Sequence, residues 1–193
     1  MWESLKKSRL YINAGVVGRT VLGASEEDVK LTFEVNMLGV MWCLKTFLPT
    51  MITANHGHVL ITSSATAFVT VAGAVDYSAS KAAVTSIHEG IQTELKHKHG
   101  NPTVQSSAIF PATITTKMFE GIKGGGGFFL PVLSPDAVAE RMLSILVKGE
   151  SEIAMMPAMS NVNPWIRCLP VWMRVGAQDA GASSMDHLAV AKR

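Results

Sequence analysis

Two side chains that could transfer a proton together stand four residues apart in the stretch YSASKAAV, residues 77–84. Tyr77 is followed by Lys81, and on a helix these two positions share a face. An ammonium beside a phenol favours the phenolate, so a tyrosine that normally titrates near about 10 could act as an acid or base closer to neutrality. Taken alone, the pair arises easily by chance, and the alternative interpretation is a packed aromatic residue.

Two further polar residues favour the proton-transfer interpretation. Ser64 lies upstream of Tyr77 at the expected end of a strand, and Asn36 lies in the helix that precedes this strand. A serine hydroxyl in that place could hydrogen-bond a reacting oxygen and stabilise the charge that develops on it. The alternative for Asn36 is a helix residue whose amide bonds a backbone carbonyl. We predict a candidate catalytic set of Ser64, Tyr77, Lys81 and Asn36.

Alternating strand-like and helix-like segments would position these residues. Strand-like runs lie at residues 9–15, 57–64, 103–112 and 150–157, and helix-like runs, with start and stop signals, lie at residues 25–52, 75–100 and 134–149. Strands separated by such helices predict an α/β fold, a three-layer parallel sheet of the Rossmann type with helices on both faces. Ligands of such sheets lie beyond the carboxyl ends of the strands. Three polar clusters follow strands and should meet at that edge: Asn13 to Gly15, Ser63 with Ser64, and Pro111 to Thr116.

Composition excludes several classes of function. The 193 residues suit one domain, and 17 basic against 15 acidic residues give a net charge of +2 with no basic stripe for nucleic acid. Only Cys43 and Cys168 are present, without metal-ligand spacing, which suits a reducing compartment. The start of the chain shows no leader and no segment shows about eighteen charge-free apolar residues, so we expect a cytoplasmic protein that at most lies on a membrane. No metal site is expected from the four histidines at a turn and a helix end, His56, His58, His97 and His99.

The motifs together resemble the short-chain dehydrogenase/reductase family over residues 9 to 160. The matching residues are Asn13-Ala14-Gly15 in INAG, Asn36 in EVNMLG, Ser64 in ITSS, Tyr77 and Lys81 in YSASK, and the segment PATITT that begins at Pro111. The resemblance implies an oxidoreductase that uses NAD or NADP to interconvert an alcohol and its ketone or aldehyde. Tyr77 would be the acid/base, Ser64 would hold the substrate oxygen, and Lys81 would tune the phenol and orient the cofactor ribose.

The resemblance also implies further roles and shows departures from the family pattern. Asn36 would anchor a water that links Lys81 to solvent. The implied cofactor-binding residues are Asn13, Ala14, Gly15, Lys81, Pro111, Ile114 and Thr116. Three positions depart from the usual residues: Ile12 replaces an asparagine, while Ala67 and Ala112 replace glycines. No residue here distinguishes NADH from NADPH.

A larger departure concerns the glycine-rich turn that holds the pyrophosphate in this family. The pattern Thr-Gly-x-x-x-Gly-x-Gly does not occur in the sequence. We therefore expect a chain truncated at its N-terminus, which begins at the fourth strand of the family fold and has weakened affinity for a dinucleotide. The strand near residues 9–12 would then have an open edge, to be covered by a second copy or another partner. The alternative function is a catalytically silent fragment that only binds.

The C-terminal residues 161–193 are interpreted as a tail that follows the partial catalytic domain of residues 1–160. Trp165, Leu169 and Trp172 alternate there with Arg167 and Arg174, a mixture suited to a membrane surface. The alternative is an ordinary tail packed on the domain. This tail is similar to that of retinol and hydroxysteroid dehydrogenases on the endoplasmic reticulum and lipid droplets. The glycine-rich loop at residues 123–128 is interpreted as a substrate-side lid, and the alternative is a plain surface loop. The apolar run GGFFLPVL indicates an apolar pocket and, with the tail, points to a lipophilic substrate.

Overall fold

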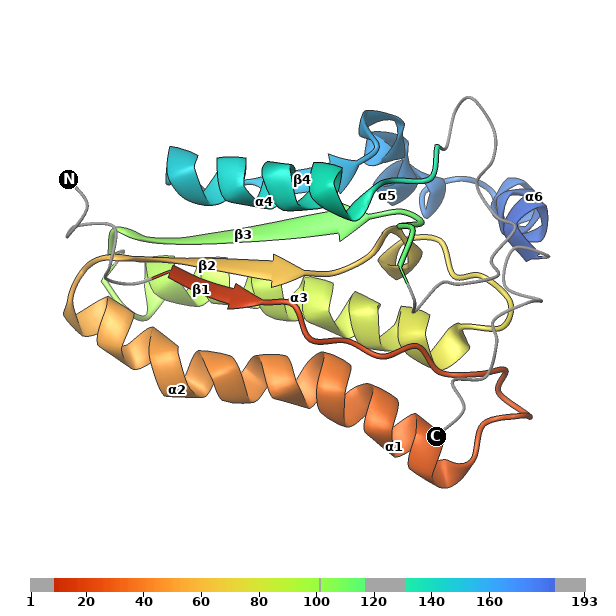
Figure 1. Ribbon diagram of the computed structural model, residues 1–193, viewed down its shortest axis with the longest axis horizontal. Helices are drawn as coiled ribbons and strands as arrows, with labels where there is room; N and C mark the ends of the chain where they lie inside the picture. The colour runs from red at the N-terminus through yellow and green to blue at the C-terminus, as the bar shows by residue number, and fades with distance from the viewer. Residues whose placement is uncertain (1–8, 101, 117–130, 183–193) are drawn as a thin grey trace.

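The protein forms a four-stranded, fully parallel sheet with helices on both faces (Figure 1). The computed structural model describes residues 9–100, 102–116 and 131–182. The strands are β1 (Arg9–Ile12), β2 (Gly57–Thr62), β3 (Val104–Pro111) and β4 (Ile153–Met156), and they lie side by side in chain order. The α/β, Rossmann-type arrangement predicted from the alternating segments is confirmed.

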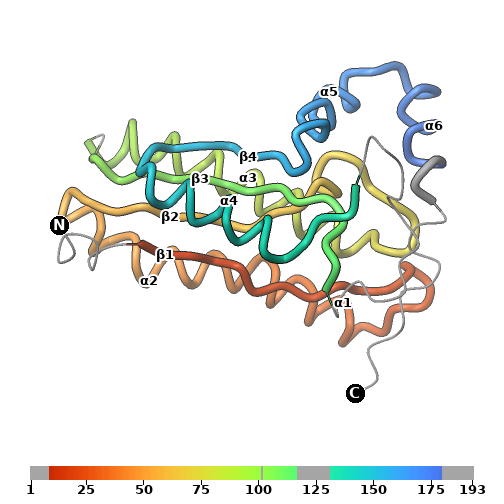
Figure 2. The backbone as a smooth tube through the Cα atoms, turned by 45° about the horizontal axis from the view of Figure 1, so that its top comes forward, coloured from red at the N-terminus to blue at the C-terminus, as the bar shows by residue number. Residues whose placement is uncertain are grey.

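The two central strands are buried on both sides because helices cover both faces. Val59, Leu60 and Ile61 of β2 are completely buried, as expected for a strand inside a parallel sheet. Two helices, α2 (Gly39–Thr53) and α3 (Val75–His97), lie on one face, and α4 (Pro135–Lys148) lies on the other (Figure 2).

Side-chain caps set where two of the helices begin. Ser25 and Asp28 form a reciprocal capping box at α1 (Glu26–Phe33). Ser134 accepts a hydrogen bond from the Ala137 amide at the start of α4, and Gly149 ends that helix in the left-handed conformation. Both starts match the signals in the sequence.

A π-helical turn, η2 (Glu34–Leu38), joins α1 and α2 into one continuous helix. This helix, Glu26–Thr53, is the one helix in the described part of the chain that is long and apolar enough to cross a membrane by length and composition alone. The helix itself was predicted at residues 25–52, but no segment of the sequence was expected to be apolar enough to span a membrane. Val40, Leu44 and Met51 are buried against the sheet core, and a core helix of a soluble domain meets the same two criteria.

Shorter elements surround the carboxyl ends of the strands. These are the 3₁₀ turns η3 (Ala65–Ala67) and η5 (Ala158–Val162) and the helices α5 (Asn163–Ile166) and α6 (Val171–Ala182). α6 projects beyond that end of the sheet (Figures 1 and 2). β1 is an edge strand of the sheet, and within the described residues it pairs with β2 alone. Within this described part of the chain, the outer edge of β1 has no strand paired to it.

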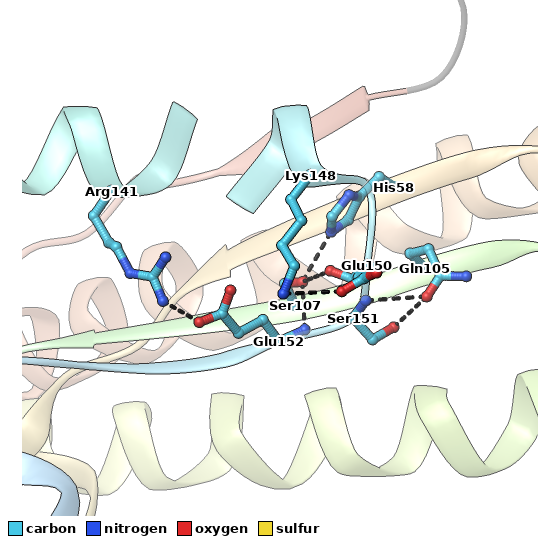
Figure 3. A network of polar contacts seen from close by, with 8 residues as sticks. All are labelled: His58, Gln105, Ser107, Arg141, Lys148, Glu150, Ser151 and Glu152. Carbon is cyan, nitrogen blue, oxygen red and sulfur yellow. Dashed lines mark hydrogen bonds and ion pairs between the residues drawn. The ribbon is translucent and has the colours of Figure 1, made fainter. Parts of the chain in front are cut away.

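A polar network joins β2, β3 and the segment that leads into β4 (Figure 3). His58 Nε2 lies 2.8 Å from the Ser107 hydroxyl, which also accepts a hydrogen bond from the Glu152 amide at 2.9 Å. Arg141 of α4 pairs with the Glu152 carboxylate. Burial, with a smaller contribution from Arg9, lowers the pKa of His58. These contacts fix β4 and α4 against the central strands.

Candidate active site

The predicted catalytic residues lie together at the carboxyl end of β2, because α3 begins beneath that end of the sheet (Figure 1). Ser64 follows β2 directly, and Tyr77 and Lys81 lie in the first two turns of α3. Asn36 comes from η2, which packs against α3. All four side chains are buried, with 6% or less of each residue exposed.

Ser64 and Tyr77 meet through their hydroxyl groups. Burial raises the pKa of the Tyr77 phenol, and a hydrogen bond from the Ser64 side chain lowers it in part. The sequence reading instead expected Lys81 to bring this pKa down toward neutrality. That expectation is not met in this structure, because the desolvation of the phenolate is the largest influence on Tyr77.

Lys81 lies beside the tyrosine ring. Its Nζ is 5.7 Å from the Tyr77 ring centroid and donates a hydrogen bond to the Thr62 carbonyl at 2.9 Å. Burial lowers the pKa of Lys81 to about 8. An ammonium carries three N–H donors, so Lys81 retains capacity for a ligand at the end of the sheet.

Asn36 joins three segments through its amide. Its Oδ1 accepts from the Val16 amide at 2.8 Å, and its Nδ2 donates to the Val16 carbonyl and to the Ser80 hydroxyl, each at 2.9 Å. Bonding to a backbone carbonyl was the alternative considered for this residue from the sequence, and it holds here. The bonds also fix the loop after β1 against α3.

The Asn-Ala-Gly turn after β1 leads into this cluster. Asn13 and Ala14 are exposed, and Gly15 is half-buried. A Cβ placed on Gly15 would lie 3.5 Å from Lys81 Nζ and 3.5 Å from Asn36 Oδ1. The glycine therefore leaves a small space between the amide and the ammonium.

The segment after β3, unlike the turn after β1, makes its backbone contacts with β4 and with the residue before the cap of α4. Ala112 donates its amide hydrogen to the Met156 carbonyl at 2.7 Å, and Ile114 pairs with Leu133 in an isolated parallel bridge. Pro111 is the last residue of β3, Ile114 is partly buried and Thr116 is exposed. The structure thus places these predicted cofactor residues at the correct end of the sheet, while their bonds run to β4 and to the start of α4. The loop predicted as a lid, residues 123–128, lies outside the described residues.

More than half of the chain matches the model of one protein family. Residues 8–124 match the family model described as short chain dehydrogenase. This chain belongs to the short-chain dehydrogenase family. Retinol dehydrogenase 10 of Homo sapiens is 39% identical over 145 residues, which are 72% of this chain and 42% of that protein. Retinol dehydrogenase 10-B of Danio rerio is 32% identical over 176 residues, 86% of this chain and 52% of that protein. The chain thus spans about half the length of these curated relatives.

Solved structures of short-chain dehydrogenases show the same fold. A short chain dehydrogenase from Burkholderia cenocepacia, solved in complex with NADP, has a TM-score of 0.67 and 25% identity, and the match covers 83% of this chain and 63% of that one. Serine dehydrogenase from Escherichia coli has a TM-score of 0.62 and 24% identity, covering 80% and 68%. The second likeness supports the fold alone.

The short-chain dehydrogenase site also contains residues that the sequence reading did not select. Ser80 accepts from Asn36 and donates to the Tyr77 carbonyl at 2.7 Å. Asp76 accepts from the Tyr77 amide at 2.7 Å and from the Thr32 hydroxyl at 3.1 Å. Both lie next to a selected residue in the sequence, and that proximity was the only available signal.

Arg167 contacts the turn after Ser64, which was not predicted from the sequence. The sequence left open whether its segment faces a membrane or packs on the domain, and its guanidinium donates to the carbonyls of Ala67 at 2.6 Å and Phe68 at 3.1 Å, as in the packed alternative. About one hundred residues separate the partners, so no local pattern could indicate the contact. Arg167 thus ties the C-terminal segment to the turn that follows Ser64.

Proposed function

We propose that this short-chain dehydrogenase is an oxidoreductase that interconverts a lipophilic alcohol, retinol-like or steroid-like, with its aldehyde or ketone and uses NAD or NADP. The observation that carries the proposal is the buried pair of Ser64 and Tyr77 hydroxyls beside the Lys81 ammonium. Paired hydroxyls can bind one oxygen atom of a substrate and exchange a proton with it. The retinol dehydrogenase relatives support the choice of substrate class.

The residues of the chain divide the work of such a reaction. The nicotinamide, when bound, supplies or accepts the hydride. Tyr77 gives a proton to the substrate oxygen, or takes one from it, and Ser64 hydrogen-bonds the same oxygen. Burial raises the pKa of Tyr77, so the phenol is protonated at neutral pH and is ready to donate to a carbonyl oxygen. Lys81 provides positive charge next to the ring.

The residues at the end of the sheet fit the nicotinamide half of a dinucleotide. The Lys81 ammonium has donors for ribose hydroxyls, and Gly15 leaves space beside it and beside Asn36. A side chain at Gly15 would fill that space. The full set of residues that we assign to the cofactor is Asn13, Ala14, Gly15, Lys81, Pro111, Ile114 and Thr116.

We also propose that the C-terminal segment makes peripheral contact with a membrane. Its large apolar side chains are exposed, with 72% of Trp165 and 73% of Trp172 accessible. Tryptophan is favoured where apolar and aqueous regions meet. Flotation of the protein with anionic phospholipid vesicles tests this, since replacement of both tryptophans with serine should release it. Equal flotation of the variant would contradict the proposal.

The open edge of β1 supports a further part of the proposal, a partner that covers it. Tyr11 on this strand is 42% exposed, and exposed strand edges recruit other strands. Sedimentation of the purified chain over a range of concentrations tests for self-association. A monomer at every concentration would leave a different chain as the only candidate partner.

The test of the main proposal combines cofactor binding with turnover. NADH and NADPH are titrated into the purified chain while nucleotide fluorescence is followed, and oxidation of retinol or reduction of retinal is measured with and without Tyr77→Phe. Tyr11→Phe is the matched control, because Tyr11 is the one other tyrosine. Turnover that depends on Tyr77 but not on Tyr11 supports the proposal. A folded chain that binds no nucleotide and turns over no substrate would favour a binding protein without catalysis.

A further inference from the structure

The turn after Ser64 makes two contacts with the Ser64 hydroxyl itself. Ser64 precedes η3 in an extended conformation and caps it. Its Oγ accepts one hydrogen bond from the Thr66 amide at 3.2 Å and a second from the Thr66 hydroxyl at 3.0 Å. The hydrogen bond from the backbone N–H is the ordinary cap of such a turn. The hydrogen bond from the Thr66 hydroxyl, in contrast, depends on which side chain stands at position 66.

These two bonds determine how Ser64 can interact with anything else. A serine hydroxyl has one hydrogen to donate and two lone pairs that accept. Thr66 occupies both lone pairs, so the remaining capacity of Ser64 is its own O–H. That O–H must point away from the turn, and Tyr77 lies there, since its phenol shares a hydrogen bond with Ser64.

We propose that Thr66 is a positioning residue that makes Ser64 a hydrogen-bond donor toward the Tyr77 oxygen and toward the substrate oxygen that binds between them. The proposal rests on the proposed function for its substrate, but the contact with Tyr77 exists in the free protein. A hydroxyl that donates to an oxygen stabilises negative charge on that oxygen, so in this arrangement Ser64 opposes part of the rise in the Tyr77 pKa that burial causes. If Ser64 accepted instead, its effect on the phenol would have the opposite sign.

The turn that carries Thr66 is itself held in place. Arg167 donates to the carbonyls of Ala67 and Phe68 at the end of η3. The Phe68 ring packs on Phe110 of β3 with centroids 5.1 Å apart. Ala67 is almost completely buried in the same apolar cluster. Thr66 therefore has little freedom to move away from Ser64, and its hydroxyl can impose one orientation.

The consequence for the reaction is a fixed direction of hydrogen bonding. When a carbonyl is reduced, negative charge develops on its oxygen as the hydride arrives, and a donor that already points at this oxygen stabilises it without reorganisation. Ser64 with a freely rotating hydroxyl would spend part of its time as an acceptor. The Thr66 side chain thus acts on the substrate through Ser64 and touches no reacting atom.

The test needs no catalytic activity, because the chain has only two tyrosines. In a Tyr11→Phe background, the ionisation of Tyr77 is followed by phenolate absorbance and by the carbon-13 resonance of its Cζ, with circular dichroism as the check of folding. We expect Thr66→Val to raise the Tyr77 pKa, as Ser64→Ala does, and Thr66→Ser to restore it. In the Ser64→Ala background, Thr66→Val should have no further effect.

Several outcomes would overturn the proposal. An unchanged Tyr77 pKa in Thr66→Val is one, and an equal shift with and without Ser64 is another, because it would mean that Thr66 acts on the fold. If alkali unfolds the chain before the phenol ionises, the Cζ resonance at neutral pH decides, since Thr66→Val and Ser64→Ala should move it in the same direction. Thr66→Ala is the second variant if valine disturbs the turn.

Turnover adds a readout that separates this proposal from the proposed function. Thr66→Val should lower kcat for reduction of retinal about fivefold, the equivalent of one net hydrogen bond, and leave KM for the nucleotide unchanged. A wild-type chain without turnover would refute the proposed function, while the tyrosine measurements would still decide the role of Thr66.

Discussion

Replacement of Lys81 with methionine should stabilise the fold while it removes activity. The charged ammonium is buried, and its pKa falls from 10.5 to about 8 because of desolvation. That difference corresponds to about 3 kcal/mol of folding free energy lost at neutral pH. Methionine has a similar length and no charge, but it leaves the Thr62 carbonyl without its donor, which costs about 1 to 2 kcal/mol. We expect a net gain of about 1 to 2 kcal/mol at pH 7.

The pH dependence of this gain gives the decisive assay, urea unfolding of wild type and Lys81→Met between about pH 7 and pH 11. Because the folded-state pKa of Lys81 is lowered, the unfolded wild type binds the proton more tightly, and wild-type stability rises from about pH 8 to about pH 10.5. The advantage of the variant should shrink over that window and stay constant below it. Lys96→Met, on the exposed side of the same helix, is the matched control and should show no such trend. A destabilised Lys81→Met with no pH dependence in this window would refute the reasoning.

Three further predictions use the same unfolding assay. Burial lowers the pKa of His88 to about 4. The destabilising effect of this residue should therefore be absent above about pH 6.5 and reach about 3 kcal/mol as the pH falls to about 4. His88→Gln should remove most of this pH dependence of the unfolding free energy, and an unchanged pH dependence would contradict us. Gly18→Ala should destabilise the fold by about 1 to 3 kcal/mol, because the new Cβ would lie 1.6 Å from Asp76 Oδ2. Gly90→Ala is the control: a Cβ there would meet nothing within 4 Å, so this variant should be neutral or more stable by up to about 1 kcal/mol. Equal effects of the two substitutions would argue against the close contact at Gly18. Arg167→Met should cost about 1 to 3 kcal/mol by leaving two carbonyls without donors, and wild-type stability in this variant would mean that the contact contributes nothing.

The fold could be predicted from the sequence because the controlling signals are local. Strand β2 reads as an apolar run, and α4 carries its cap, its proline and its terminal glycine within the printed sequence. Such features decide an element whatever lies next to it. The order of the strands is not determined in the same way. The strands run in chain order while α2 and α3 lie on one face and α4 on the other, so the crossovers cannot all be right-handed. What the sequence did not indicate is the π-helical turn around Asn36, because no residue pattern distinguishes one extra residue per turn.

The site could be predicted only as a set of residues, without its electrostatics. Ser64, Tyr77 and Lys81 were selected by type and spacing, and the structure brings them to one end of the sheet. The direction of the Tyr77 pKa was wrong because spacing along a helix says nothing about desolvation. Burial depends on how the sheet, α3 and the turn after β2 close around the phenol. That is a property of the assembled fold.

The way these side chains are held explains where further substitutions should matter most. Asn36, Ser64 and Lys81 are each fixed by hydrogen bonds to loops and helix turns rather than by close apolar packing. A lost methylene in a core shifts packing over several neighbours, whereas a lost donor here lets one catalytic atom rotate while the core is unchanged. Substitution of Thr66, which is only partly buried, should therefore change the chemistry of the site at a smaller cost in stability than substitution of the fully buried Ser80. Substitution of the buried apolar residues Val59, Leu60 and Ile61 of β2 with alanine or glycine should do the reverse, because these side chains form the core that holds the site and touch none of the proposed catalytic groups.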